Sequence, residues 1–168
     1  LSVVWGTVKD HQGYINVESR QGWGSTFTLY FPVTREAISV AGAEVSPARY
    51  AGRGESILVV DDVAGQRELT AEMLRSLHYQ VAVAAGGEEA LAFLREHRVD
   101  LLVLDMIMEP GMDGLETYRR VLELHPGQRA VIVSGFSETE RVKEAQALGA
   151  GPYVRKPYVI EKIGRAVR

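Results

Sequence analysis

Five short apolar runs, separated by longer stretches with helical spacing, constrain the fold of this chain more than any other feature. The runs lie at residues 57–60, 81–84, 101–104, 130–133 and 153–154. Between them, apolar residues recur three or four positions apart, as in the series Leu69, Met73 and Leu77. Strands that alternate with helices form right-handed crossovers and a parallel sheet with helices on both faces. The central runs are apolar throughout, as strands buried on both faces require.

The chain divides into three segments by composition and periodicity. Residues 55–168 carry the strand and helix alternation, so we predict an α/β fold with a doubly wound, five-stranded parallel sheet. Residues 36–54 are small and mixed, rich in Ala and Gly, and show no sustained period, which indicates a linker. The pattern of residues 1–35 predicts a helix followed by a β-hairpin, with Gly22 and Gly24 in the turn.

Composition excludes several classes of function. The absence of cysteine excludes disulfides, Cys-based metal sites and a Cys nucleophile. The net charge of -3 gives no electrostatic argument for nucleic acid or a membrane surface. No apolar run approaches the roughly 20 residues that span a bilayer, and Leu1 begins without a basic leader. We therefore expect a cytoplasmic fragment or processed chain, whose parent could still be membrane-anchored through segments that are not present.

Polar residues stand at the ends of the predicted strands. Asp61 and Asp62 close the first strand, Asp105 the third, Ser134 the fourth and Lys156 the fifth. The carboxyl ends of parallel strands lie at one edge of the sheet, where the ligands of doubly wound folds bind. We therefore expect three carboxylates, one hydroxyl and one ammonium group to meet at a single rim.

This set of side chains suits a phosphoryl group. Three carboxylates at close range repel one another, and a hard divalent cation removes that conflict. Mg²⁺ takes one or two carboxylates together with phosphate oxygens, so it is the expected metal, with Mn²⁺ as an alternative. Lys156 and Ser134 would serve the remaining phosphoryl oxygens. No glycine-rich nucleotide loop follows the first strand, so an aspartyl phosphate, formed by a carboxylate nucleophile, is the predicted chemistry.

Residues 55–168 resemble the receiver domain of two-component response regulators. The resemblance rests on the Asp61–Asp62 pair, Asp105 with the following "MEPGMDG", Ser134, and "KP" at Lys156–Pro157. These separated positions occur in the right order on the right predicted elements, which makes the pattern highly specific. The resemblance implies the strand order 2-1-3-4-5.

The resemblance also implies an acceptor and a metal site. Asp105 would accept the phosphoryl group from a phosphohistidine, so a histidine kinase or a histidine phosphotransfer domain is the expected partner. Asp61, Asp62, Asp105 and the backbone carbonyl of Ile107 would hold Mg²⁺. The loop after Asp105 is one residue longer than is usual in the family, with Glu109 as the apparent extra residue. The insertion reshapes the loop but follows Ile107, so metal ligation should survive.

The remaining matched positions imply phosphoryl binding and signalling. Ser134 and Lys156 would bind the phosphoryl oxygens. Ser134 would move toward the phosphate, and Tyr153 would swing inward behind it as the switch. The Lys156–Pro157 peptide bond would be cis, at a cost of about 0.5–1 kcal/mol that a fold can impose.

The first segment resembles the C-terminal end of the ATP-binding domain of histidine kinases. Gly22, Gly24, Ser25 and Phe27 match the turn and strand that close that domain. The ATP-binding helix, the lid and the phosphorylated histidine have no counterpart in the sequence. We therefore expect a hybrid sensor histidine kinase as the parent and no ATP binding by this fragment. Packing on the receiver, pairing with a second copy as a dimer, and poor order remain open for the helix and hairpin.

Two other functions compete with the phosphoacceptor. A magnesium-dependent phosphatase of the haloacid-dehalogenase type would need a second Asp two residues after the nucleophile, where this chain has Ile107. A receiver that serves only as a protein-interaction domain usually lacks one of the key residues, and none is missing in this sequence. Both alternatives are therefore disfavoured against the phosphoacceptor.

Overall fold

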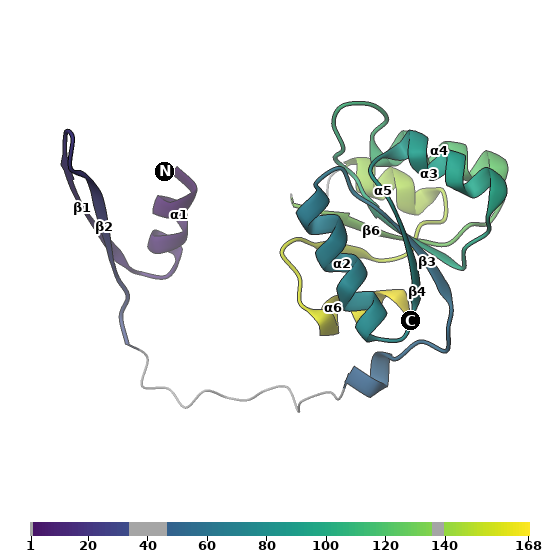
Figure 1. Ribbon diagram of the computed structural model, residues 1–168, viewed down its shortest axis with the longest axis horizontal. Coiled ribbons are helices and arrows are strands. Elements are labelled where there is room, and N and C mark those ends of the chain that lie inside the picture. The colour runs from purple at the N-terminus through teal and green to yellow at the C-terminus, as the bar shows by residue number, and fades with distance from the viewer. Residues whose placement is uncertain (1, 34–46, 136–139) are drawn as a thin grey trace. The chain divides into compact units, whose positions relative to one another are not determined.

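The computed structural model describes residues 2–33, 47–135 and 140–168 of the chain (Figure 1). The chain separates into two compact units, Leu1–Ala43 and Glu44–Arg168. Among the described residues, no helix combines the length and apolar character needed to cross a membrane.

The first unit contains the predicted helix and hairpin. Helix α1 spans Ser2–Asp10, and strands β1 (Tyr14–Arg20) and β2 (Gly24–Tyr30) pair antiparallel. Gly22 and Gly24 have φ angles of 79° and 97°, so the turn uses the left-handed region that glycine adopts at no steric cost. Within the hairpin, Val17 lies opposite Phe27.

The second unit is the predicted doubly wound sheet. Its elements are η1 (Pro47–Tyr50), β3 (Ser56–Val60), α2 (Ala64–Ser76), β4 (Gln80–Ala84), α3 (Gly87–Glu96), β5 (Leu101–Asp105), α4 (Gly114–Leu124), β6 (Ala130–Ser134), α5 (Glu140–Ala147), β7 (Tyr153–Arg155) and α6 (Ile160–Val167). The strand order is β4-β3-β5-β6-β7, and all four pairings are parallel. This order confirms the predicted 2-1-3-4-5 arrangement.

Alternate residues of the central strands face opposite layers of helices. Leu58 and Leu102 belong to an apolar cluster that includes residues of α3, α4 and α5. Ile57 and Val103 belong to a second cluster that includes residues of α2 and α6. Because successive side chains of a strand point to opposite faces, both faces of β3 and β5 are covered. This double coverage explains why the central runs are apolar throughout.

The predicted linker ends sooner than residue 54. The residues numbered 36–46 lie outside the described residues, but Pro47–Tyr50 forms a 3₁₀ helix. Tyr50 is 5% exposed and joins the cluster under α6, and its carbonyl accepts a hydrogen bond of 3.2 Å from the Tyr79 hydroxyl. A Cβ on Gly164 of α6 would lie 2.9 Å from the Tyr50 Cβ. The sequence is aperiodic at this point, and tertiary packing gives it structure.

Candidate functional site

Three carboxylates converge at the carboxyl edge of the sheet. Asp61 and Asp62 directly follow β3, and Asp105 is the last residue of its neighbour β5. One oxygen from each of the three carboxylates lies within 4.8 Å of the others. Asp61 is 2% exposed and Asp105 is 6% exposed, whereas Asp62 is half-buried. The topology therefore brings together the acids that the sequence predicted, in a place with little water to screen them.

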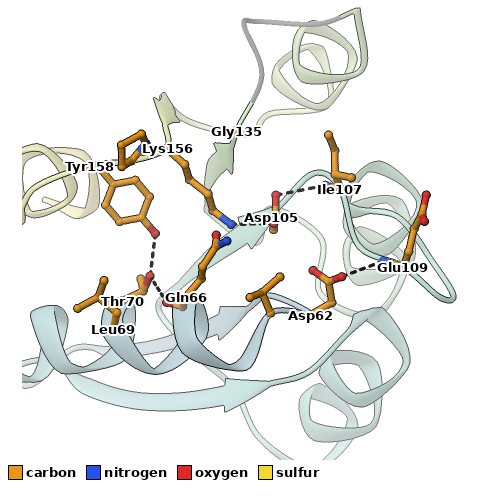
Figure 2. A pocket seen from close by; sticks show the side chains of 12 residues that line it. Asp62, Gln66, Leu69, Thr70, Asp105, Ile107, Glu109, Gly135, Lys156 and Tyr158 are labelled. Atoms are coloured by element: carbon orange, nitrogen blue, oxygen red, sulfur yellow. Dashed lines mark hydrogen bonds and ion pairs between the residues drawn. The ribbon is translucent and has the colours of Figure 1, made fainter. Parts of the chain in front are cut away.

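Lys156 lies among these acids. Its Nζ is 2.5 Å from Asp61 Oδ2. The same Nζ is 2.7 Å from Asp105 Oδ2 (Figure 2). Burial alone would lower the pKa of Lys156, but its hydrogen bonds to Asp105 and Asp61 outweigh burial and raise that pKa. Burial raises the pKa of Asp105, although the hydrogen bond from Lys156 opposes that shift. The ammonium group thus stays charged and partly compensates the buried carboxylates.

Backbone N–H groups hold each carboxylate in position. Asp61 Oδ1 accepts a hydrogen bond from the N–H of Val63 at 2.9 Å, and Asp105 Oδ1 accepts one from Ile107 at 3.2 Å. Asp62 Oδ2 accepts one from Glu109 at 3.2 Å. Each donor lies in the turn that directly follows a strand or in the loop after β5. The turn after β3 and the loop after β5 therefore fix the positions of the three carboxylates.

The other predicted site residues lie at the same edge. Ser134 is buried at the end of β6, and its carbonyl accepts a hydrogen bond of 2.8 Å from the N–H of Lys156. Tyr153 begins β7 and packs, half-buried, against the cluster under α3 and α4. The Lys156–Pro157 peptide bond is cis, which confirms that prediction. The functional roles of Ser134 and Tyr153 stay predictions.

The extra residue near Glu109 lies in a loop that is tied down at two points. The Glu109 N–H contacts Asp62, and the Met112 N–H donates to Glu88 Oε1 at 3.2 Å. Asp113 then caps α4, because its Oδ1 accepts the Glu116 N–H at 2.9 Å. The insertion is therefore absorbed before the helix begins, and the loop contacts the acid cluster directly.

An open pocket of about 690 Å³ lies beside the acids. Its lining comes from the turn after β3, from α2, from the end of β5 and the loop that follows it, from the residue after β6 and from the segment after β7. The residues are Asp62, Val63, Gln66, Leu69, Thr70, Asp105, Ile107, Glu109, Gly135, Lys156, Pro157 and Tyr158. Both acidic and apolar side chains contribute to the lining (Figure 2). A group bound in this pocket would meet the carboxylate of Asp105 and the amine of Lys156.

Sequence reasoning missed three residues of this edge. Arg67 of α2 donates a hydrogen bond to the backbone carbonyl of Asp61 at 2.6 Å. Thr70, also on α2, lies 2.7 Å from the hydroxyl of Tyr158. The place of Tyr158 directly after "KP" could have drawn attention to it. No local pattern marks Thr70 as its partner, because the two residues are 88 positions apart.

The donor set fits a hard divalent cation. All candidate ligand atoms in the cluster are carboxylate oxygens, which Mg²⁺ prefers, and the sequence has no cysteine to offer a softer ligand. The oxygens are close enough to share one ion. Asp61, Asp62 and Asp105 are therefore the residues that could hold such an ion.

Comparisons with known proteins agree with this geometry. Residues 57–168 match the response regulator receiver domain family. The sporulation initiation phosphotransferase F of Bacillus subtilis is 38% identical over 114 residues, which cover 68% of this chain and 91% of that protein. The sensor kinase CckA of Brucella abortus is 29% identical over 177 residues, which cover all of this chain but only 19% of that protein.

A solved structure of a complex that includes BeF₃ and Mg²⁺ shares the fold of this chain. One chain of the CheX–CheY–BeF₃–Mg²⁺ complex of Borrelia burgdorferi matches with a TM-score of 0.66 and 26% identity. The match covers 73% of this chain and 96% of the other. That likeness extends over most of the unit that holds the acid cluster.

Proposed function

Since this chain belongs to the response regulator receiver domain family, we propose that Asp105 accepts a phosphoryl group from a phosphohistidine. The observation that carries the proposal is the position of the Asp105 carboxylate. It is one of three clustered acids, and its Oδ2 lies 2.7 Å from the Lys156 amine. Receiver domains act in two-component systems with histidine kinases or histidine phosphotransfer proteins, and we propose such a protein as the donor.

The transfer is a displacement at phosphorus. An oxygen of Asp105 forms the new O–P bond while the P–N bond to the donor imidazole breaks, and the imidazole nitrogen keeps the electron pair. The Lys156 ammonium, already beside Asp105, stabilises the negative charge on the phosphoryl oxygens. The buried hydroxyl of Ser134 is proposed as a second donor to those oxygens, and Tyr153 as the side chain that follows its movement.

A divalent cation completes the proposed site. Asp61, Asp62, Asp105 and the backbone carbonyl of Ile107 would hold Mg²⁺, with Mn²⁺ as a substitute. When bound, the cation supplies positive charge that neutralises the acids and the incoming phosphoryl oxygens. Without it, Asp61 and Asp105 share the single ammonium of Lys156, which leaves the cluster with excess negative charge.

We propose a hybrid sensor histidine kinase as the parent protein. The alignment with the sensor kinase CckA, which includes the first unit as well as the receiver, supports this origin. So does the hairpin, with the turn glycines Gly22 and Gly24 that resemble the end of a kinase ATP-binding domain. Residues 1–35 would then be a remnant of that domain, and this chain would not use ATP.

Intact-mass measurement after incubation with acetyl phosphate and Mg²⁺ tests the acceptor. We expect the wild-type chain to gain one phosphoryl group and Asp105→Asn to gain none. The matched control is Asp100→Asn, which removes an acid directly before the other end of β5 and should leave the adduct intact. A wild-type chain that binds Mg²⁺ but forms no adduct would indicate an interaction domain instead. Labelling by ATP alone would contradict the proposed remnant.

A further inference from the structure

A hydrogen bond joins two elements across the pocket beside Asp105. Thr70 lies on α2 and Tyr158 lies in the segment between β7 and α6, and their hydroxyl oxygens are 2.7 Å apart (Figure 2). Thr70 is 2% exposed, and Tyr158 is half-buried. Burial raises the pKa of Tyr158, which keeps the phenol protonated at physiological pH. The contact is therefore a bond between two neutral hydroxyl groups at the wall of the pocket, and Thr70 itself is buried.

The direction of this bond follows from a second contact. The Thr70 Oγ1 donates to the backbone carbonyl of Gln66 at 2.8 Å, which uses its one proton. The Tyr158 hydroxyl must then be the donor to Thr70. The resulting chain runs from Tyr158 through Thr70 to Gln66, and bonds in such a chain strengthen one another. Replacing either hydroxyl removes this hydrogen bond between α2 and the segment after β7, although the Tyr158 ring still packs on the apolar cluster that includes Leu74 of α2.

The Thr70–Tyr158 hydrogen bond completes a closed path of backbone and side-chain contacts around the acid site. Helix α2 begins at Ala64, with Val63 as the N-cap residue between it and the acid pair, and the Val63 N–H donates to Asp61 Oδ1 at 2.9 Å. From Asp61 the path follows α2 to Thr70, crosses to Tyr158 and returns along the backbone to Lys156. It closes where the Lys156 amine meets Asp61 Oδ2 at 2.5 Å. The position of Tyr158 therefore constrains where Lys156 can place its amine.

Only one residue separates Lys156 from Tyr158, and it is Pro157. The proline ring restricts its own φ angle, so little backbone freedom lies between the amine and the anchored phenol. On the other side, the Lys156 N–H is bonded to the Ser134 carbonyl at 2.8 Å. Lys156 is thus held from both directions, by β6 through its backbone and by α2 through Tyr158.

We propose that Tyr158 and Thr70 are positioning residues for Lys156, which they hold against Asp61 and Asp105. The proposal rests on the proposed phosphoacceptor function as far as the reaction is concerned, but the positioning itself is a property of the unphosphorylated chain. Both residues line the pocket, but neither hydroxyl is hydrogen-bonded to Asp105, and the pair is not proposed to bind the transferred group. Its loss should slow phosphorylation without removing any group that takes part in the transfer.

Phosphorylation kinetics of Tyr158→Phe and Thr70→Val in the full chain test the first consequence. At saturating Mg²⁺ and acetyl phosphate, we expect each rate constant to fall about fivefold, the change that about 1 kcal/mol in the barrier produces. Thr70→Ser retains the hydroxyl, so its phosphorylation rate constant should stay close to that of the wild type. The matched control is Tyr118→Phe, which removes another buried phenol hydroxyl. That hydroxyl is bonded to the Gln128 carbonyl at 2.9 Å, and Tyr118 does not line the pocket beside Asp105.

A second measurement does not depend on phosphorylation. Limited acylation at one pH, followed by peptide mass spectrometry, compares the Lys156 amine with the exposed amine of Lys162 on α6. We expect Tyr158→Phe and Thr70→Val to raise the labelling of Lys156 relative to Lys162 severalfold, and Thr70→Ser and Tyr118→Phe to leave the ratio unchanged.

The two measurements separate the two proposals. A wild-type chain that gains no phosphoryl group overturns the proposed function, while the labelling ratio still decides the positioning role. Equal labelling of Lys156 in wild type, Tyr158→Phe and Thr70→Val overturns the positioning role, whatever the phosphorylation rates. An equal loss of rate in Tyr118→Phe would also overturn it, because the effect would then be one of general stability.

Discussion

The two units of this chain have equally regular secondary structure but very different burial. In the first unit, strand residues of the hairpin alternate between apolar and polar, yet Trp5, Trp23, Phe27 and Leu29 are all exposed. Among its residues with described side chains, Val8 is the one buried apolar residue. The receiver unit instead buries two apolar clusters, one on each face of its sheet. Local pattern therefore suffices to form a strand, but burial requires a second layer.

This difference bears on the proposed origin of the first unit. An isolated two-stranded hairpin is marginally stable in water, because it has no layer to cover its apolar face. A sheet fragment taken from a larger domain would show such exposed apolar residues. The chain also offers a way to watch the units separately, because both of its tryptophans, Trp5 and Trp23, lie in the first unit. Tryptophan emission reports on that unit, and far-ultraviolet circular dichroism reports mainly on the helices of the receiver.

The largest expected difference between the units concerns apolar side chains. Leu58 is fully buried in the interior strand β3. Leu58→Ala should lower the free energy of unfolding of the receiver by about 2–5 kcal/mol, because a cavity remains. Leu29 in β2 is 44% exposed, and Leu29→Ala should change the receiver transition by less than about 0.5 kcal/mol. Urea titrations followed by circular dichroism measure both values.

The same titrations can break the comparison. If tryptophan emission and circular dichroism change together in the wild-type chain, the first unit unfolds cooperatively with the receiver. The hairpin would then have a covering layer in solution, and Leu29→Ala should cost as much as a buried leucine does.

A smaller effect on stability is expected when a glycine in either unit is replaced by alanine. A Cβ at Gly114 would lie 2.2 Å from the carbonyl oxygen of Asp105 and 2.7 Å from the Cα of Met106. Gly114→Ala should therefore destabilise the receiver by about 1–3 kcal/mol, because backbone atoms must move. It should also slow phosphorylation, since Asp105 itself is displaced. Thermal unfolding and the phosphorylation assay measure the two effects.

Gly6 is the control for this substitution. It lies in α1 with open space around its Cα, so Gly6→Ala should favour the helix by about 0.5–1 kcal/mol. The receiver transition should not respond. A receiver that is equally stable with Ala at position 114 would show that the loop after β5 is looser than its contacts indicate.

The smallest predicted effect concerns a surface contact whose contribution to stability depends on pH. Asp100 Oδ2 accepts hydrogen bonds from the backbone N–H of Ser56 at 2.7 Å and from its hydroxyl at 2.8 Å. The backbone bond, followed by the hydroxyl bond, lowers the pKa of Asp100 in the folded state. Its stabilising contribution is therefore present above the unfolded pKa of about 4, and is lost as the pH falls through the folded pKa.

Asp100→Asn tests this contribution. Solvent screens the exposed site, so we expect a loss of about 1 kcal/mol or less at neutral pH, which shrinks toward zero in acid. Unfolding free energies across the acidic range provide the measurement. Glu72→Gln, which changes an exposed acid of α2, should alter stability little at any pH. A penalty for Asp100→Asn that stays constant through the acid range would contradict the assigned cause.

Most of the receiver fold was predictable because its signals are local. A short apolar run predicted each strand. Because the strands pair in parallel, the polar residues after these runs lie at one edge of the sheet. Asp61, Asp105 and Lys156 meet there for that reason. The cap at Asp113 was equally local, since a cap bonds an N–H only three residues away.

The residues that the sequence did not indicate depend on distant partners. Tyr50 occurs in an aperiodic stretch, and it became part of the core because α6, more than a hundred residues later, packs on it. Glu109 contacts Asp62 only because the loop after β5 folds back over the end of β3. Neither contact leaves a trace in composition or period.

The order of the strands was inferred from the resemblance to receiver domains. The sequence by itself determined which elements form and the edge at which the acids gather. These depend on side-chain periodicity and on the handedness of the crossovers, both of which act through neighbours in the chain. The tertiary structure alone decided how the amine of Lys156 is held and that Thr70 meets Tyr158. Such contacts depend on the distance between elements, which is set when the side chains of all the layers pack together.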